Sequence, residues 1–279
     1  MIIKEAKTNG FCFGVKKAIA LAKKTAKTSQ KKNLYIIGDI VHNEKVVRDL
    51  ELMGIKKVNS ISEIPSGATL VLKAHGSPPQ FYQQARKRRL KVIDATCPMV
   101  KEIHKKALYW EKQGWRVIVF GDRTHEEVIA LCGYLKKPLV IEKSKEAKKI
   151  KNCQRAVLIC QSTQSIDEAL NLLKELAKKI KEIVFLNTIC QETLNRQQEV
   201  KNLAKESDKI LIIGSRKSAN TRRLYQISRK INPSTFWIQE ASNLNLDIFS
   251  PPDKIGLISG ASTPQEIIKE VKNKLLNRN

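Results

Sequence analysis

The sequence predicts an α/β protein built from three similar small domains with mostly parallel sheets in a pseudo-threefold arrangement. Apolar runs of four to six residues, such as 117–120 and 210–213, alternate with helical stretches, as in parallel strands that are buried on both faces. Three phrases of sequence also recur once in each third of the chain. Their period is too long for a solenoid, so we expect three fused copies of one domain, with boundaries at 1–96, 97–189 and 190–279.

The first recurring phrase is a short apolar run, a cysteine and an amphipathic helical stretch. It occurs at 2–6 before Cys12, at 91–95 before Cys97 and at 182–186 before Cys190, so that the cysteines are 85 and 93 residues apart. Equivalent positions of fused repeats meet around a symmetry axis, and a helix N-terminus favours the thiolate form of cysteine. The three thiolates therefore predict a metal cluster with one coordination position left open.

Two further phrases put a polar side chain just after a strand in every repeat. One is an apolar run, a glycine and a His or Ser four positions later, and the other is an apolar run followed within five residues by His, Ser or Thr. The residues are His42, His125 and Ser218 in the former and His75, Ser162, Thr163, Ser262 and Thr263 in the latter. Ligands of parallel α/β sheets bind beyond the carboxyl ends of the strands, which is where all these side chains are expected.

The other three cysteines, Cys132, Cys153 and Cys160, occupy no recurring position, and each is interpreted as a small buried or incidental residue. The chain has no C-x-x-C pair, which disfavours a zinc ribbon or a thioredoxin motif. Thiolates alone suit zinc or an iron–sulfur cluster. Three cysteines leave a structural zinc site incomplete unless a histidine closes it, whereas a [4Fe–4S] cluster would keep one iron open, and this interpretation explains more residues.

The chain contains 52 Lys and Arg against 27 Asp and Glu, a formal net charge of +25. Basic pairs are scattered without the interleaved aromatic residues of a nucleic-acid platform, so nucleic-acid binding is disfavoured. A solvated lysine-rich surface, which would include His104, is the simplest interpretation, and a field that attracts an acidic electron donor and an anionic substrate is the functional one. Without a run of 18 apolar residues or a signal peptide, a soluble, cytoplasmic protein with no membrane partner is expected.

Short motifs are dispersed over most of the chain. They are Asn-Gly-Phe-Cys-Phe-Gly-Val at 9–15, Val-His-Asn at 41–43, Ala-His-Gly at 74–76, Asp-Ala-Thr-Cys-Pro at 94–98, Cys-Gln-Glu-Thr at 190–193, Asn-Arg-Gln at 195–197, Ser-Ala-Asn at 218–220 and Gly-Ala-Ser at 260–262. In content and order these motifs resemble the 4-hydroxy-3-methylbut-2-enyl diphosphate reductases, the IspH/LytB family.

The resemblance implies three α/β domains around one central [4Fe–4S] cluster per chain. Cys12, Cys97 and Cys190 would bind three irons, and the fourth iron would be open to the hydroxyl oxygen of the substrate. The implied reaction uses two electrons and two protons to remove the allylic hydroxyl of (E)-4-hydroxy-3-methylbut-2-enyl diphosphate as water. It yields isopentenyl and dimethylallyl diphosphates in the last step of the methylerythritol phosphate (non-mevalonate) pathway, and a ferredoxin or flavodoxin would supply the electrons.

The resemblance also implies the roles of individual residues. Glu127 would be the catalytic acid, with Thr163 beside it. The residues that would bind the substrate are His42, His75, His125, Thr163, Ser218, Asn220 and Ser262. Where the family has His-Pro-Glu-Val this chain has His-Glu-Glu-Val at 125–128, and Ala130 and Ala219 also depart from the family pattern. Glu127 is preferred to Glu126 because it keeps the spacing from His125.

An alternative is a [4Fe–4S] dehydratase of the quinolinate synthase type, in which an open iron acts without net reduction. Such an enzyme handles dicarboxylates, for which arginine forks at the pocket are expected. The predicted strand ends of this chain carry His, Ser, Thr and Asn instead. This composition favours a diphosphate pocket.

Overall fold

The structure is a computed structural model that describes residues 1–28 and 33–277. Within these ranges the strands form three parallel sheets of four strands each, which confirms the predicted α/β class. The chain divides into two compact units: unit 1 comprises 1–15, 42–46 and 191–279, and unit 2 comprises 16–41 and 47–190. No helix in the described ranges is both long enough and apolar enough to cross a bilayer.

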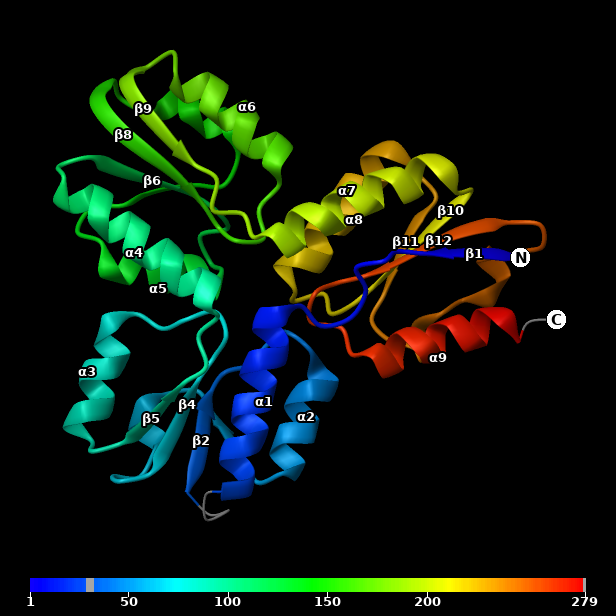
Figure 1. Cartoon of the computed structure of the whole chain (residues 1–279), viewed down its shortest axis with the longest axis horizontal. Helices are drawn as coiled ribbons and strands as arrows, with labels where there is room; N and C mark the ends of the chain where they lie inside the picture. Colours follow the sequence, from blue (N-terminus) through cyan, green and yellow to red (C-terminus); the bar gives the residue numbers. More distant parts are fainter. Residues whose placement is uncertain (29–32, 278–279) are drawn as a thin grey trace. The chain divides into compact units, whose positions relative to one another are not determined.

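Unit 1 contains one sheet (Figure 1). Its strands are all parallel and lie in the order β1 (Ile2–Glu5), β12 (Lys254–Ser259), β10 (Lys209–Ile213) and β11 (Thr235–Ile238). Its helices are α7 (Gln191–Glu206), α8 (Ala219–Ile231) and α9 (Gln265–Leu276), with short 3-10 helices at Ala241–Asn243 and Leu246–Ile248.

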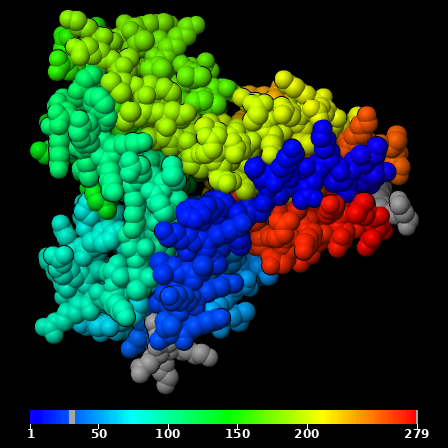
Figure 2. All heavy atoms as spheres, viewed as in Figure 1, coloured from blue at the N-terminus to red at the C-terminus, as the bar shows by residue number. Residues whose placement is uncertain are grey.

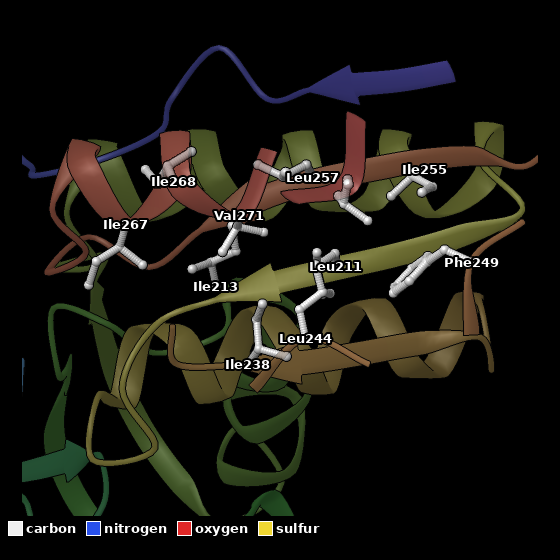
Figure 3. Close-up of a cluster of buried hydrophobic side chains, with 11 residues drawn as sticks. Leu211, Ile213, Ile238, Leu244, Phe249, Ile255, Leu257, Ile267, Ile268 and Val271 are labelled. Atoms are coloured by element: carbon white, nitrogen blue, oxygen red, sulfur yellow. The ribbon is translucent and has the colours of Figure 1, made fainter. Parts of the chain in front are cut away.

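The core of unit 1 lies on both sides of this sheet, because successive residues of a strand face opposite sides. On one side, Leu211 and Ile213 of β10 pack with the apolar face of α9 (Figure 3). On the other side, Ile210 and Ile212 pack with α7 and α8. The strand is buried on both faces, which is why its sequence is a continuous apolar run.

The first strand belongs to a different sheet from the expected one. A first domain of 1–96 assigns residues 2–5 to the first repeat, but β1 pairs with β12, and Ile3 lies opposite Ile255. Lys272 of α9 forms an ion pair with Glu5 at 3.0 Å, and Figure 2 shows the N-terminal segment beside the C-terminal helix. The described chain has no strand after α9 that could complete this sheet, so β1 supplies the edge strand.

Unit 2 contains the other two sheets. One has the strand order β3 (Lys56–Val58), β2 (Leu34–Ile37), β4 (Thr69–Leu72) and β5 (Lys91–Asp94). The other has the order β7 (Leu139–Ile141), β6 (Arg116–Phe120), β8 (Cys153–Cys160) and β9 (Ile180–Leu186). The helices between these strands are α3 (Pro79–Lys87), α4 (Pro98–Lys112), α5 (Glu126–Tyr134) and α6 (Ile166–Leu176), with 3-10 helices at Ile61–Glu63 and Ser144–Lys149. Helices α1 (Phe13–Thr28) and α2 (Glu44–Leu52) begin in unit 1 and continue into unit 2.

The three sheets repeat one topology. In each sheet the edge strand, β1, β5 or β9, is the strand that precedes one of the three recurring cysteines. The next strand inward is β12, β4 or β8, and the one after it is β10, β2 or β6. These inner strands precede the recurring polar residues. Each repeat therefore puts a cysteine and two polar segments after the carboxyl ends of three adjacent parallel strands, as the recurring phrases predicted.

His104 is buried, although its position among lysines indicated a solvated residue. Only 7% of its surface is exposed. It shares the inner face of α4 with Val100, Ile103 and Ala107, because residues three or four positions apart lie on the same side of a helix. Burial lowers the pKa of His104 to about 4.

Gly260, directly after β12, is closely packed against α8. A Cβ atom at Gly260 would lie 1.9 Å from Oγ1 of Thr221. We expect Gly260→Ala to lower the free energy of unfolding by about 1–3 kcal/mol, as overpacking usually does, in chemical denaturation. Thr221→Ala removes the clashing hydroxyl, so the double variant should recover part of this loss, and strictly additive effects would contradict the steric explanation.

Candidate functional site

Glu127 is a buried carboxyl group in the first turn of α5. Only 3% of the residue is exposed. Ser162, which follows β8, donates two hydrogen bonds to it, from its backbone N to Oε1 and from its Oγ to Oε2, both at 2.7 Å. Burial raises the pKa of Glu127 above its ordinary value, and the hydrogen bonds from Ser162 offset this effect only in part. Glu127 is therefore suited to carry a proton.

Glu126, its neighbour, has the opposite character. Its Oε2 lies 3.0 Å from Nδ1 of His75, and its Oε1 forms an ion pair with Nζ of Lys73. Burial alone would raise the pKa of Glu126, but the hydrogen bond from His75 and the charges of His75 and Lys73 hold it well below its usual range. Of the two adjacent glutamates, Glu127 retains a proton more readily and Glu126 is the carboxylate, which supports Glu127 as the acid.

Two histidines lie together beside these carboxyl groups in unit 2. The rings of His75 and His125 meet edge to face, with centroids 5.4 Å apart. His125 caps α5, since its Nδ1 accepts a hydrogen bond of 3.2 Å from the backbone N of Glu127. Unit 2 therefore brings together three predicted site residues, His75, His125 and Glu127.

Thr163 lies in the same strand-end region, and its hydroxyl is held by a residue that the sequence patterns missed. Nε2 of Gln161 donates to Oγ1 of Thr163 at 2.8 Å, and Oε1 of Gln161 accepts from the backbone N of Asp122 at 2.9 Å. Gln161 therefore joins the loops that follow β6 and β8. Its only signal in the sequence is its position directly before Ser162. Lys73 was missed as well, and its signal is its position two residues before His75.

The three recurring cysteines are anchored by one hydrogen bond that is repeated in each domain. The backbone N of Cys12 donates to the carbonyl of Ala261, that of Cys97 to Ala74, and that of Cys190 to Ser162, each at 3.0 Å. The first bond lies in unit 1 and the other two lie in unit 2. The accepting residue stands directly before Ser262, His75 or Thr163 in turn. Each cysteine is therefore tied to the segment that carries a predicted substrate ligand.

Cys97 and Cys190 are electrostatically coupled within unit 2. Burial raises the pKa of the Cys97 thiol, backbone amides of Met99 and Val100 lower it, and the charges of Cys190 and Glu127 raise it again. Cys97 is the N-cap residue of α4, and Cys190 stands directly before α7. Two nearby thiolates repel each other unless a cation lies between them, so this pair suits a soft metal centre.

In unit 1, Ser218 and Asn220 lie at the N-terminus of α8, and Ser262 contacts His42. Ser218 caps this helix, with its Oγ accepting from the backbone N of Thr221 at 3.3 Å. Oγ of Ser262 donates to the carbonyl of His42 at 3.0 Å. Asn220 is 4% exposed, and neither its Oδ1 nor its Nδ2 has a hydrogen-bond partner among the described residues. Buried amides are normally paired, so Asn220 is available to a ligand.

The segment that carries Cys12 is held by a buried arginine. Arg196 of α7 is 1% exposed, and its two terminal nitrogens donate to the carbonyls of Ser259 and Gly10 at 2.9 and 2.8 Å. The backbone N of Gly10 in turn donates to Oγ of Ser259 at 2.8 Å. Arg196 therefore connects the approach to Cys12 with the end of β12.

Comparison with known proteins identifies the family. The family model described as LytB protein matches residues 3–276. The 4-hydroxy-3-methylbut-2-enyl diphosphate reductase of Aquifex aeolicus is 39% identical over 270 residues, 95% of this chain and 93% of that protein, and that of Clostridioides difficile is 36% identical over 99% and 100%. The chain belongs to the LytB family.

Solved structures agree with this assignment. A structure described as the E-1-hydroxy-2-methyl-but-2-enyl-4-diphosphate reductase of Plasmodium falciparum aligns with a TM-score of 0.94 at 28% identity, over 99% of this chain and 88% of that chain. A structure described as (E)-4-hydroxy-3-methyl-but-2-enyl diphosphate reductase, the terminal enzyme of the non-mevalonate pathway, aligns with a TM-score of 0.72 at 38% identity, over 99% and 100%.

LytB-family reductases are iron–sulfur enzymes. The three recurring cysteines fit such a centre, because they are only half-buried and each stands directly before a helix or at its N-cap. Cys160 differs, since it is fully buried in β8 and burial raises its pKa to about 12. Cys132 lies within α5 and Cys153 begins β8, and neither occupies the segment before a helix that the recurring cysteines share.

Proposed function

We propose that this chain reduces (E)-4-hydroxy-3-methylbut-2-enyl diphosphate to isopentenyl and dimethylallyl diphosphates, the terminal step of the non-mevalonate pathway. The observation that carries the proposal is the hydrogen bond that anchors Cys12, Cys97 and Cys190 in the same way in the three repeats. Three matched cysteines leave one iron of a [4Fe–4S] cluster open for chemistry, whereas a structural zinc site would need a fourth ligand. The names of the relatives support the same activity.

Cys12, Cys97 and Cys190 would hold one [4Fe–4S] cluster per chain and leave one iron without a protein ligand. When bound, the cluster would relay the two electrons of the external donor, one at a time, and would supply a Lewis-acidic iron. The thiolates of Cys97 and Cys190 are coupled, and each of the three cysteines stands directly before a helix or at its N-cap. A helix N-terminus favours the thiolate form of cysteine, and the backbone amides of Met99 and Val100 lower the pKa of Cys97 against the effect of burial.

Glu127 would deliver a proton to the departing hydroxyl group, which leaves as water. Hydroxide is a poor leaving group, so a positioned acid is needed. Burial keeps Glu127 protonated to a higher pH than an exposed glutamate. Ser162 fixes both carboxyl oxygens, and Thr163, held by Gln161, would complete the hydrogen-bonded set next to the substrate.

The diphosphate would be bound by short polar side chains and imidazoles. The proposed ligands are His42, His75, His125, Thr163, Ser218, Asn220 and Ser262. The amide of Asn220 is buried without a partner in the described structure, and it lies in the first turn of α8, where backbone N–H groups and the helix dipole favour an anion. A diphosphate would accept a hydrogen bond from the Asn220 amide, so the site would not need a cluster of lysines to bind it.

An anaerobic assay of the purified, cluster-loaded protein tests the function. The proposal requires that the substrate be consumed only when a strong reductant is present, with two electrons used for each molecule of product. A dehydratase of the quinolinate synthase type is not favoured by the relatives, and it would turn over its dicarboxylate substrates without a reductant. Substrate left intact in the presence of reductant, by protein with a full complement of iron and sulfide, would refute the proposed function.

The basic surface would attract an acidic electron donor, a ferredoxin or a flavodoxin. With a net charge of +25, the association rate of such a donor should fall steeply as salt rises, because screening shortens the reach of the field to about 8 Å near physiological ionic strength. Turnover with a small neutral reductant serves as the control. Equal salt dependence with both reductants would contradict electrostatic docking, since weakened binding of the anionic substrate affects both assays equally.

A further inference from the structure

Glu126 and Lys73, which the reaction proposed above does not use, form a cluster with His75. Oε2 of Glu126 lies 3.0 Å from Nδ1 of His75, and Oε1 pairs with Lys73. The side chains are largely withdrawn from solvent, with exposed fractions of 27% for Glu126, 16% for His75 and 18% for Lys73. Lys73 and His75 follow β4, whereas Glu126 begins α5 after β6. The cluster therefore connects the strand ends of two different sheets within unit 2.

The contact between Nδ1 of His75 and Glu126 determines that Nε2 is the ring nitrogen that faces away from this carboxylate. A carboxylate at Nδ1 requires a proton on that nitrogen, and the partner of one ring nitrogen sets the tautomer and orientation of the whole ring. Nε2, on the other side of the ring, is then the nitrogen directed to a ligand. The ring of His125, which packs edge to face against His75, limits rotation further.

The charges around Glu126 are balanced. Lys73 and His75 contact Glu126 directly, and its charge also raises the pKa of the more distant Lys57. His75 faces Glu126, Glu127 and His125. One ammonium cancels the single negative charge of Glu126, so the carboxylate can hold His75 without presenting a net negative charge to an anionic ligand. A carboxylate without Lys73 would repel a diphosphate.

We propose that Glu126 is a positioning residue that holds His75 in the orientation in which Nε2 binds the diphosphate of the substrate. This inference rests on the proposed function, which makes His75 a diphosphate ligand. The family motif given above has proline at this position, and proline has no side-chain acceptor, so Glu126 makes a contact that the motif residue could not make. The rival explanation is purely structural: a glutamate in the first turn of α5 stabilises the helix through its dipole.

Binding of inorganic diphosphate to the cluster-loaded protein, measured by anaerobic calorimetry, tests the proposal together with steady-state kinetics. We expect Glu126→Ala to raise the Kd for diphosphate and the KM for substrate about tenfold, the loss of one charge-assisted contact. The kcat should stay within about twofold of the unaltered enzyme, because the acid Glu127 is untouched. Glu126→Gln keeps an acceptor for Nδ1 but loses the charge. Its Kd for diphosphate and its KM should therefore lie between those of the unaltered enzyme and those of Glu126→Ala.

Non-additivity with His75 separates positioning from helix stabilisation. If Glu126 acts through His75, then Glu126→Ala should add nothing to the loss caused by His75→Ala. Glu142→Ala is the matched control, because it also removes a glutamate from an ion pair, with Arg123 at 2.7 Å, outside the site. It should leave the Kd for diphosphate unchanged.

Three results would overturn the inference: an unchanged Kd in Glu126→Ala, tighter binding in that variant, or additive losses with His75→Ala. Tighter binding would mean that the carboxylate acts on the diphosphate only as a repelling charge. If Glu126→Ala does not load its cluster, the same criteria apply to Glu126→Gln. Failure of the unaltered protein to turn over substrate would refute the proposed function instead, so the two failures are distinguishable.

Discussion

Glu127→Gln should lower the turnover of the cluster-loaded enzyme by about 10²-fold or more, the usual contribution of a general acid. Glutamine keeps the size of the side chain; its oxygen can accept from the backbone N of Ser162 and its NH2 group can donate to Oγ of Ser162, but it has no acidic proton to give to the leaving hydroxyl. Substrate should still bind, because the proposed diphosphate ligands are untouched. The measurements are kcat under saturating substrate and the change in the electron paramagnetic resonance spectrum on adding substrate.

The pH dependence of kcat checks the same assignment. The pKa of Glu127 is raised by burial, so the protonated, active form persists above the ordinary range for glutamate, and kcat should fall as pH rises through the raised value. Glu127→Gln should lack this limb. Glu126→Gln is the adjacent control, and its kcat should be nearly unchanged. A crippled kcat in Glu126→Gln together with a normal one in Glu127→Gln would mean that the acid is Glu126.

Serine at Cys12, Cys97 or Cys190 should abolish cluster assembly or activity in each single variant. A serine hydroxyl is a much weaker ligand for iron than a thiolate, and an iron without its ligand is lost. The measurements are iron and labile sulfide per chain, determined anaerobically, together with turnover. One zinc per chain without sulfide in the unaltered protein would contradict the cluster itself.

The remaining cysteines provide matched controls. Cys132→Ser and Cys153→Ser change half-buried thiols outside the recurring positions, and they should retain full iron content. Cys160 is completely buried, so alanine is the better replacement there, since it does not bury a hydroxyl group. Loss of iron in any of these three variants would show that the recurring positions do not define the ligand set.

The sequence by itself determined the α/β class, the threefold repetition and the segments that carry the recurring cysteines and polar residues. These features are readable because they are local. A strand buried on both faces is a continuous apolar run, as in 210–213, and the residue that follows it is at the carboxyl end of that strand wherever the strand lies. Three copies of the same local pattern also reinforce one another.

Strand pairing is not local, so only the tertiary structure determined which strand pairs with β1. The run 2–5 looks like the beginning of the first repeat, yet β1 completes a sheet whose neighbouring strand is β12, more than two hundred residues later. Nothing in a four-residue strand specifies its partner, because backbone hydrogen bonds are the same for any parallel neighbour. The partner of β1 is determined by which sheet still lacks an edge strand.

The direction of single side chains was also decided only by the tertiary structure. Glu126 and Glu127 are adjacent in the sequence, but consecutive residues of a helix point about 100° apart. Because of the way α5 packs, the side chain of Glu127 is buried, whereas that of Glu126 contacts His75 and Lys73. His104 is buried for the same reason, on the inner face of α4. The pattern of residues along a chain names the candidate acids and ligands. Their protonation depends on burial and on charges brought near by folding, which local sequence does not contain.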